Sequence, residues 1–332
     1  WLLGTTSSMI PSSKKIISVC AVRTGCGKSQ TSKKITQILK NLGEKVVAVR
    51  HAMPYGNLEK QKVQRYEVIA DLEKHDCTIE EMEEYEPYIT IGIPVYAGVD
   101  YEAILREAEK EADIIIWDGG NNDFSFYLPD LEIVVVDPHR PGDELTYFPG
   151  EVNLKRAHVI VINKMDSADP ENIQQVRNNI ERINPKATVI EARSPVFCDE
   201  GEKITGQRVL VIEDGPTLTH GGMKYGAGTL AAKQYGAKEI IDPRPWLTGT
   251  LKETFEKYPE IGNLLPAMGY GKQQIKDLEQ TINDSDCDCV VIGTPIDLTR
   301  VIDIKKPSAR VTYDLEEIGS PNLETVLKSF LK

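Results

Sequence analysis

Short apolar runs rich in β-branched residues alternate with amphipathic segments along most of the chain. Apolar strands that alternate with helices are typical of a parallel sheet covered on both faces, so the pattern predicts an α/β fold. The first part of the chain is predicted to contain strands at 16–21, 45–50, 93–97, 113–118, 131–137, 158–163 and 188–192, and helices at 29–41, 58–74, 101–111 and 172–183.

A polar, glycine-containing segment at 199–207 interrupts this pattern, which then restarts. We therefore predict a first α/β domain at 14–205 and a smaller, Rossmann-like α/β domain at 206–332, with residues 1–13 as a tail. Glycines and prolines are frequent between the elements of the second domain. It is predicted to contain strands at 208–212, 239–241, 289–292 and 310–313, and helices at 227–235, 272–283 and 323–331.

The segment 22–29, VRTGCGKS, lies between the first predicted strand and the first predicted helix, which is the setting of a P-loop. Backbone N–H groups of such a loop converge on nucleotide phosphates, and its glycines permit the close approach. Lys28 is expected to neutralise the transferred phosphate, and the Ser29 hydroxyl to ligate Mg²⁺. The residues predicted to bind the phosphates are Thr24, Gly25, Cys26, Gly27, Lys28 and Ser29.

The P-loop departs from its usual signature at the first position, where Val22 replaces glycine. Arg23 follows, at the position where deviant-lysine ATPases carry a second lysine. That resemblance implies that Arg23 reaches phosphate oxygens across a dimer, so a homo-oligomer is predicted. An arginine that simply lies on the surface is the equal alternative.

An acidic residue, Asp118, ends the apolar strand predicted at 113–118, and two glycines follow it. This is the Walker B arrangement, in which the carboxylate holds Mg²⁺ directly or through water. Asp118 and Ser29 are therefore the predicted metal ligands. A strand-end aspartate in an ordinary turn is the alternative.

The tetrapeptide Asn163-Lys164-Met165-Asp166 follows the strand predicted at 158–163 and matches the Asn-Lys-x-Asp pattern that reads guanine. The carboxylate of Asp166 would accept two hydrogen bonds from guanine, which adenine cannot supply. Asn163, Lys164 and Asp166 are therefore predicted to bind the base. The nucleotide stays open between ATP and GTP.

Two loops that follow predicted strands carry cationic or titratable side chains. Arg140 lies in the segment 137–142, and His220 lies in the glycine-rich segment 213–222. Ligands in open α/β sheets bind beyond the carboxyl ends of the strands. We therefore predict that Arg140 contacts an anionic substrate and that His220 transfers a proton. The alternative is that such a histidine only caps or satisfies its loop.

Composition excludes several partners. The 39 Lys and Arg against 51 Asp and Glu give a net charge of −12, which disfavours nucleic acid and anionic membranes. No apolar run approaches the roughly 18 residues of a membrane span. The six cysteines are scattered, and the start of the chain lacks the pattern of a signal peptide. We therefore expect reduced thiols and a cytoplasmic protein.

Several of these runs together resemble the family of cyclic 2,3-diphosphoglycerate synthases, also described as predicted GTPases. The resemblance implies an ATP-dependent ligase that closes 2,3-diphosphoglycerate into a cyclic phosphoanhydride and releases ADP and phosphate. Family members carry an extra N-terminal α/β domain, so the tail at 1–13 is interpreted as its remnant. The runs are AVRTGCGKS at 21–29, WDGGNND at 117–123, DPHRPG at 137–142, EDGPTLTHGG at 213–222 and GTPID at 293–297.

The sequence thus predicts an enzyme that transfers the γ-phosphate of a Mg²⁺-nucleotide, most simply a ligase acting on a small phosphorylated anion. Lys28, Arg23, Asp118, His220 and Arg140 are its predicted catalytic residues. The alternative is a GTPase that acts as a regulatory switch or a metallochaperone-like protein. Such proteins often carry a His- or Cys-rich metal tract, and this sequence has none.

Overall fold

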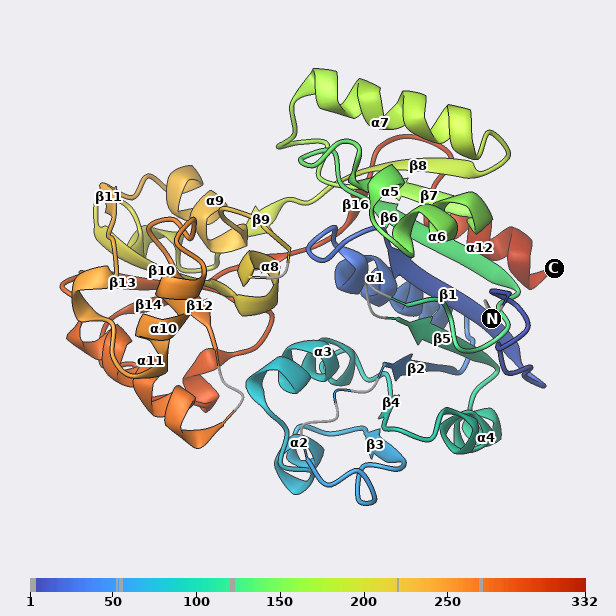
Figure 1. Cartoon of the computed structure of the whole chain (residues 1–332), viewed down its shortest axis with the longest axis horizontal. Helices are drawn as coiled ribbons and strands as arrows, with labels where there is room; N and C mark the ends of the chain where they lie inside the picture. The colour runs from blue at the N-terminus through green and yellow to red at the C-terminus, as the bar shows by residue number, and fades with distance from the viewer. Residues whose placement is uncertain (1–3, 52, 54–55, 120–122, 220, 269–270) are drawn as a thin grey trace. The chain divides into compact units, whose positions relative to one another are not determined.

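The computed structural model describes residues 4–332, except 52, 54–55, 120–122, 220 and 269–270. The chain forms two compact units, and each is built from several segments. Unit 1 contains residues 1–75, 88–195 and 314–332, and unit 2 contains residues 76–87 and 196–313. Figure 1 labels most helices and strands of both units.

A nine-stranded sheet forms the centre of unit 1 (Figure 1). Its strands lie in the order β16-β8-β7-β6-β1-β5-β2-β4-β3, and all pairs are parallel except those of the two edge strands, β16 and β3. Nearly every residue of the central strands is buried, as expected for a sheet with helices on both faces. The strands are β1 (Lys15–Ala21), β2 (Val46–Arg50), β3 (Gln64–Tyr66), β4 (Val95–Ala97), β5 (Ile114–Asp118), β6 (Leu131–Val136), β7 (Val159–Ile162), β8 (Thr188–Arg193) and β16 (Glu316–Glu317).

Helices cover both faces of this sheet. Helices α1 and α12 pack together, with α1 against β1, β2 and β5. Helix α4 contacts β2 and β4, and α6 contacts β1 and β6. Asp100 and Asp169 cap the N-termini of α4 and α7 by accepting hydrogen bonds from backbone N–H groups of the first turn. The helices are α1 (Lys28–Asn41), α2 (Ala70–Lys74), α4 (Tyr101–Glu111), α5 (Asp143–Thr146), α6 (Gly150–Arg156), α7 (Pro170–Ile183) and α12 (Leu323–Leu331).

The side chains at the end of β5 alternate between the two faces of the sheet. Trp117 is fully buried on one face, in an aromatic cluster with Tyr101, Phe126 and Tyr127. Asp118, the next residue, must therefore point to the opposite face, which α1 covers. Aromatic packing around Trp117 thus fixes the direction of the acidic side chain beside it.

Unit 2 contains a smaller parallel sheet in the order β11-β10-β13-β14, and β12 also pairs with β10. Its strands are β10 (Arg208–Asp214), β11 (Glu239–Ile240), β12 (Leu265–Ala267), β13 (Cys289–Gly293) and β14 (Ser308–Arg310), and an antiparallel pair joins β9 (Val196–Phe197) to β15 (Thr312–Tyr313). Its helices are α8 (Gly215–Thr219), α9 (Ala227–Gln234), α10 (Thr250–Lys257) and α11 (Lys272–Asp284), with short 3₁₀ turns at Gly201–Lys203, Arg244–Trp246 and Leu298–Arg300.

The predicted α/β class with a parallel sheet and a second α/β body is confirmed. The predicted helix at 58–74 is wrong, because the chain there forms edge strand β3 and the short helix α2. Gln64 and Tyr66 are buried in β3, which pairs with β4 and so follows a strand pattern. Helix α3 (Ile79–Ile89) was not predicted, because its buried positions include glutamates and so lack an apolar stripe.

The predicted domains are two consecutive segments of the chain, whereas each compact unit combines segments that are separate in the sequence. The C-terminal residues 314–332 belong to unit 1, and residues 76–87 from the first half of the chain belong to unit 2. The bounds 14–205 and 206–332 therefore stay a prediction. Within the described ranges, no helix has the length and apolar character needed to cross a bilayer.

We expect α12 to contribute to the stability of unit 1. Leu327 is fully buried on this helix, whereas Lys328 beside it is exposed. Leu327→Ala should lower the free energy of unfolding by about 2–5 kcal/mol, because it leaves a cavity in the core. Lys328→Ala should change it by less than about 0.5 kcal/mol. Chemical denaturation followed by circular dichroism measures both, and equal effects would contradict the packing.

Candidate functional site

The P-loop lies between β1 and α1, as predicted. Gly25 and Gly27 have φ of 83° and 99°, values that L side chains rarely adopt. A Cβ on Gly27 would also lie 2.1 Å from Nδ2 of Asn163. No side chain caps α1, and no acidic residue lies in its first turn. The N–H groups at the start of α1 are thus left for an anion, with the positive end of the helix dipole behind them.

The P-loop lysine is held by the Walker B aspartate. Nζ of Lys28 lies 2.7 Å from Oδ1 of Asp118, and the Ser32 hydroxyl donates to the same oxygen at 3.0 Å. Lys28 is 5% exposed and Asp118 is fully buried, so this ion pair is screened little by water. The ammonium group of Lys28 has three N–H donors, so a phosphate that binds it shares or replaces this carboxylate.

Two further donors hold the other oxygen of Asp118. Oδ2 lies 2.6 Å from a guanidinium nitrogen of Arg50 and 2.6 Å from the hydroxyl of Tyr88. Arg50 ends β2 directly opposite Asp118 in the parallel register, which explains why the two side chains meet. Burial alone would raise the pKa of Asp118, but Arg50 and Lys28 hold it well below its usual range. Burial and the charge of Asp118 raise the pKa of Tyr88, so Tyr88 keeps the proton that it donates.

These contacts test the predicted magnesium ligands. The hydroxyl of Ser29 lies at the start of α1, partly exposed, and suits an octahedral Mg²⁺ site. Both oxygens of Asp118 already accept hydrogen bonds, two on each. Asp118 therefore fits a metal or a metal-bound water only after Lys28 has moved away from Oδ1.

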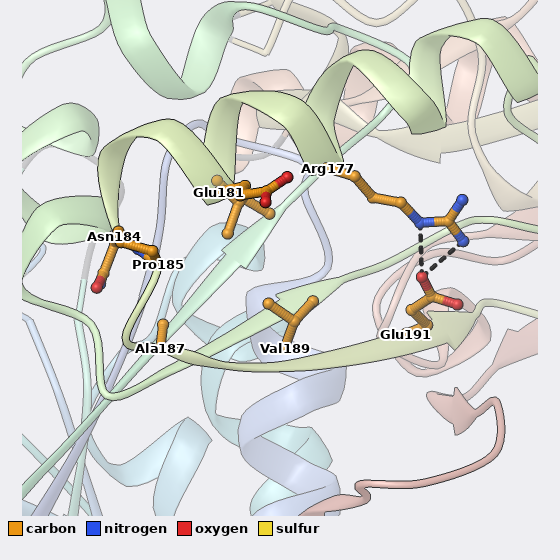
Figure 2. Close-up of a pocket in the computed structure, with 8 residues that line it drawn as sticks. Arg177, Glu181, Asn184, Pro185, Ala187, Val189 and Glu191 are labelled. Carbon is orange, nitrogen blue, oxygen red and sulfur yellow. Dashed lines mark hydrogen bonds and ion pairs between the residues drawn. The ribbon is translucent and has the colours of Figure 1, made fainter.

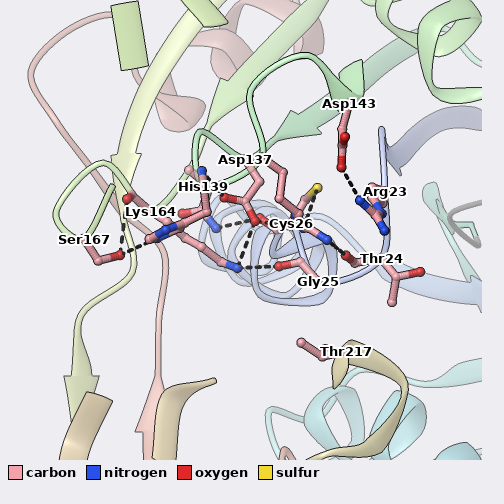
Figure 3. A network of polar contacts seen from close by, with 12 residues as sticks. Arg23, Thr24, Gly25, Cys26, Asp137, His139, Asp143, Lys164, Ser167 and Thr217 are labelled. Atoms are coloured by element: carbon pink, nitrogen blue, oxygen red, sulfur yellow. Dashed lines mark hydrogen bonds and ion pairs between the residues drawn. The ribbon is translucent and has the colours of Figure 1, made fainter. Parts of the chain in front are cut away.

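A second cluster of buried polar groups braces the P-loop from the ends of β6 and β7 (Figure 3). Asp137 is buried and accepts from Arg140 at 2.9 Å and from Lys164 at 3.2 Å. Arg140 also donates to the backbone carbonyl of Thr24 at 2.8 Å, and Lys164 to that of Gly25. Both cations thus bind P-loop carbonyl groups, which orients the neighbouring N–H groups toward the phosphate site.

The Asn-Lys-x-Asp segment contributes to the same brace. Asn163 is fully buried and donates to the carbonyl of Cys26 at 3.0 Å. Lys164 has a φ of 58°, an uncommon value for a residue with a side chain, and its two contacts stabilise it there. Asp166 is exposed and accepts from the backbone N–H of Ser194 at 3.0 Å. Its predicted contact with a base stays a prediction.

Arg23 has partners within its own chain. Its guanidinium forms an ion pair with Asp143 (Figure 3). It also lies 4.3 Å from the centre of the Tyr147 ring. A cation over an aromatic face is stabilised by the ring quadrupole. Contact with a phosphate across a dimer would require Arg23 to leave these partners, and this role also stays a prediction.

Two predicted features cannot be placed. His220 and the segment 120–122 lie outside the described residues.

A hollow of about 300 Å³ lies between α7 and β8, and an ion pair between Arg177 and Glu191 forms part of its lining (Figure 2). None of the residues predicted to bind nucleotide lines this hollow.

Sequence reasoning missed several residues that shape this site. Arg50, Tyr88 and Ser32 contact Asp118, and Asp137 contacts both bracing cations. Arg50 and Asp137 each stand at the carboxyl end of a predicted strand, which is a usable signal. Tyr88 carried no such signal, because the helix that ends beside it was not predicted.

We expect Lys28→Ala to abolish nucleotide turnover. The ammonium group is the one expected to meet the γ-phosphate, so its loss should lower the rate by about 100-fold or more. Asp118 keeps Arg50 and Tyr88 as partners, so the fold should survive. Lys34→Ala, on the exposed side of the same helix, serves as the control. Phosphate release with ATP or GTP measures the effect, and turnover near that of Lys34→Ala would contradict the P-loop assignment.

Comparison with known proteins agrees with this geometry. The model of the P-loop domain of cyclic 2,3-diphosphoglycerate synthetase matches residues 91–192. Arginine synthetase ArcE from Thermococcus kodakarensis is 64% identical over 332 residues, which are all of this chain and 74% of that protein. Cyclic 2,3-diphosphoglycerate synthetase from the same organism is 30% identical over 96 residues, or 29% of this chain and 22% of that protein.

A solved structure extends the likeness to the fold of the chain. LpxK from Aquifex aeolicus, in complex with ATP, matches with a TM-score of 0.58 at 12% identity, over 98% of this chain and 91% of that chain. This supports the fold alone. The resemblance seen in the sequence motifs is confirmed by the family model and by the 64% identity to a relative that matches over the whole of this chain. The chain belongs to the P-loop enzyme family that includes arginine synthetase ArcE and cyclic 2,3-diphosphoglycerate synthetase, and it is an enzyme of the nucleotide-dependent ligase type.

Proposed function

We propose that this chain is an ATP-dependent ligase that forms arginine. The observation that carries the proposal is the 64% identity to an arginine synthetase over all 332 residues. The match to cyclic 2,3-diphosphoglycerate synthetase is weaker and covers only 29% of the chain. Both names describe syntheses that a P-loop can drive by transferring a γ-phosphate to an oxygen atom.

The chemistry of arginine suggests the order of steps. A guanidinium carbon carries three nitrogens and no oxygen, so an oxygen-bearing precursor must lose its oxygen. The simplest precursor is the ureido amino acid citrulline. Its ureido oxygen attacks the γ-phosphorus of ATP, and ADP leaves. Ammonia then attacks the activated carbon, and inorganic phosphate leaves with the oxygen, so citrulline, ammonia and ATP give arginine, ADP and phosphate.

The described P-loop residues suit the first step. The N–H groups at the start of α1 would bind the phosphates, and Lys28 would exchange its Asp118 partner for the γ-phosphate. Mg²⁺, held by Ser29 and reached by Asp118, would neutralise charge on the phosphates. Arg50 and Tyr88 would keep Asp118 ionised and in place when Lys28 leaves. Arg140 would act as a positioning residue for the P-loop, because its contacts are to Thr24 and Asp137.

A second candidate is the synthesis of cyclic 2,3-diphosphoglycerate that the sequence motifs suggested. The match of residues 91–192 to that P-loop domain favours it. In this reaction an oxygen of a second substrate phosphate, rather than ammonia, would displace the transferred phosphate. A GTPase switch remains the alternative without an acceptor.

Product formation with purified protein separates the three functions. Mg²⁺-ATP with citrulline and ammonium should yield arginine and ADP in equal amounts. Chromatography of the reaction mixture measures both products. ATP with 2,3-diphosphoglycerate should give no cyclic product. Cyclic product without arginine would support the second candidate, and GTP hydrolysis that no acceptor stimulates would support the switch. Lys28→Ala should stop every nucleotide-dependent product.

Asp166 tests the choice of base. Because we propose ATP as the substrate, Asp166→Ala should change kcat/KM for ATP by less than about threefold. The exposed carboxylate would then have a local role through Ser194. A parent protein that prefers GTP, and loses about tenfold or more of that preference in Asp166→Ala, would instead assign guanine recognition to this residue.

A further inference from the structure

Two buried amide side chains lie against the P-loop in unit 1. Gln30 follows Ser29 in α1 and is 6% exposed, and Asn163 directly follows β7 and is fully buried. A Cβ on Gly27 would lie 2.1 Å from Nδ2 of Asn163 and 2.8 Å from Nε2 of Gln30. Both amides therefore approach the backbone of the P-loop at the same residue.

Each amide has one polar atom that lacks a hydrogen-bond partner among the described residues. Asn163 donates from Nδ2 to the carbonyl of Cys26, and the unpartnered atom is its Oδ1. Because a carbonyl oxygen can only accept, this contact fixes which way the Asn163 amide faces. The hydroxyl of Ser194 donates to Oε1 of Gln30 at 3.2 Å, and the unpartnered atom of Gln30 is Nε2. The pair thus presents one buried donor and one buried acceptor, which cost free energy unless a ligand satisfies them.

The strand order places this pair toward the base end of a bound nucleotide. Lys28 contacts Asp118 of β5, on one side of β1. Asn163 and Ser194 follow β7 and β8, on the other side of β1. Three strand spacings of about 4.8 Å separate β7 from β5, or about 14 Å in all. The γ-phosphate and Mg²⁺ belong to the Asp118 side, so the base extends the opposite way, across the carboxyl ends of β7 and β8.

We propose that Gln30 and Asn163 bind the adenine base of the nucleotide and determine its specificity. The exocyclic amino group of adenine is a donor, and a ring nitrogen on each side of it is an acceptor. Oδ1 of Asn163 accepts from the amino group, and Nε2 of Gln30 donates to one of the ring nitrogens. Guanine in the same orientation presents an oxygen to Oδ1 of Asn163, so two acceptors face each other and the buried group stays unpaired.

The choice of adenine rests on the proposed function, which uses ATP. Recognition of the base is then assigned to Gln30 and Asn163 instead of Asp166. Asp166 is exposed and accepts from the backbone N–H of Ser194, so water competes for it. Gln30 and Asn163 are buried, where a hydrogen bond is stronger and a missing one is more costly.

Isothermal titration calorimetry of the full chain with Mg²⁺-ADP tests the base contact without turnover. Gln30→Met keeps the length of the side chain and removes its donor, so ADP should bind about tenfold or more weakly. Gln37→Met is the matched control, because Gln37 is exposed on the same helix. Its affinity for ADP should stay within about twofold of the parent. Parental affinity in Gln30→Met, or an equal loss in both variants, overturns the proposal.

Base analogues assign the two contacts separately. Purine riboside diphosphate lacks the exocyclic amino group, so the parent should bind it about tenfold more weakly than ADP. Equal affinity for the two nucleotides overturns the contact with Asn163. The analogues 1-deaza-ADP and 7-deaza-ADP each lack one ring nitrogen beside the amino group. With one of them, Gln30→Met should cost less than about twofold, because the contact is already missing. A tenfold loss with both analogues overturns the contact with Gln30.

GDP and thermal melting test specificity and a structural role. The parent should bind GDP about tenfold or more weakly than ADP. A parent that prefers GDP overturns the assignment of adenine. Gln30→Met should melt without nucleotide at an equal or higher Tm, since it removes a buried unpaired donor. A lower Tm together with parental ADP affinity overturns the site and assigns Gln30 to the fold alone.

The outcomes also separate this site from the proposed function. If the parent forms arginine from ATP while Gln30→Met binds ADP as the parent does, the function stands and the site falls. If Gln30→Met loses ADP affinity and the parent forms no arginine, the site stands and the function falls.

Discussion

The buried carboxylate of Asp118 is the group on which the P-loop unit depends. A carboxylate removed from water costs several kcal/mol unless cations and donors surround it. Its four partners come from separate parts of the chain: Lys28 and Ser32 from α1, Arg50 from β2 and Tyr88 from the end of α3. They meet only if β5 lies beside β2 and α1 covers the correct face. Satisfying this one charge therefore requires both the pairing of β2 with β5 and the position of α1 over them.

The same ion pair gives the P-loop an internal competitor for its ligand. Lys28 binds Asp118, so a phosphate competes with this carboxylate for the ammonium group. Arg50 makes this exchange feasible, because Asp118 keeps one cation after Lys28 leaves. The brace of Asp137, Arg140 and Lys164 has a separate role, since it binds carbonyl groups and leaves the P-loop N–H groups directed at the ligand.

Local rules predicted the elements that carry the P-loop, and long-range contacts explain what those rules missed. Local sequence patterns were enough to predict the strand, the glycine-rich loop and the helix around Lys28. They were also enough to place Asp118 at the end of a strand. Arg50 could not be assigned to Asp118, because a single sequence does not specify which parallel strands pair. Helix α3 was missed because buried glutamates replace the apolar stripe that identifies a helix. Tyr88 was therefore missed as a partner of Asp118, although Thr78 and Glu81 form a capping box that marks the start of its helix.

The distribution of charged side chains indicates whether the described residues suit a phosphorylated acceptor. A ligase that acts on a doubly phosphorylated acid needs cations for its acceptor as well as for its nucleotide. In unit 1, Arg140 and Lys164 are committed to Asp137 and the P-loop backbone, and Arg23 to Asp143. In unit 2, Asp214 stands at the carboxyl end of β10, and Glu213 accepts hydrogen bonds from the backbone N–H groups at the start of α9. Acidic groups at that strand end repel a phosphorylated acid. The committed cations of unit 1 and the acidic groups of unit 2 therefore both count against a doubly phosphorylated acceptor, each within its own unit.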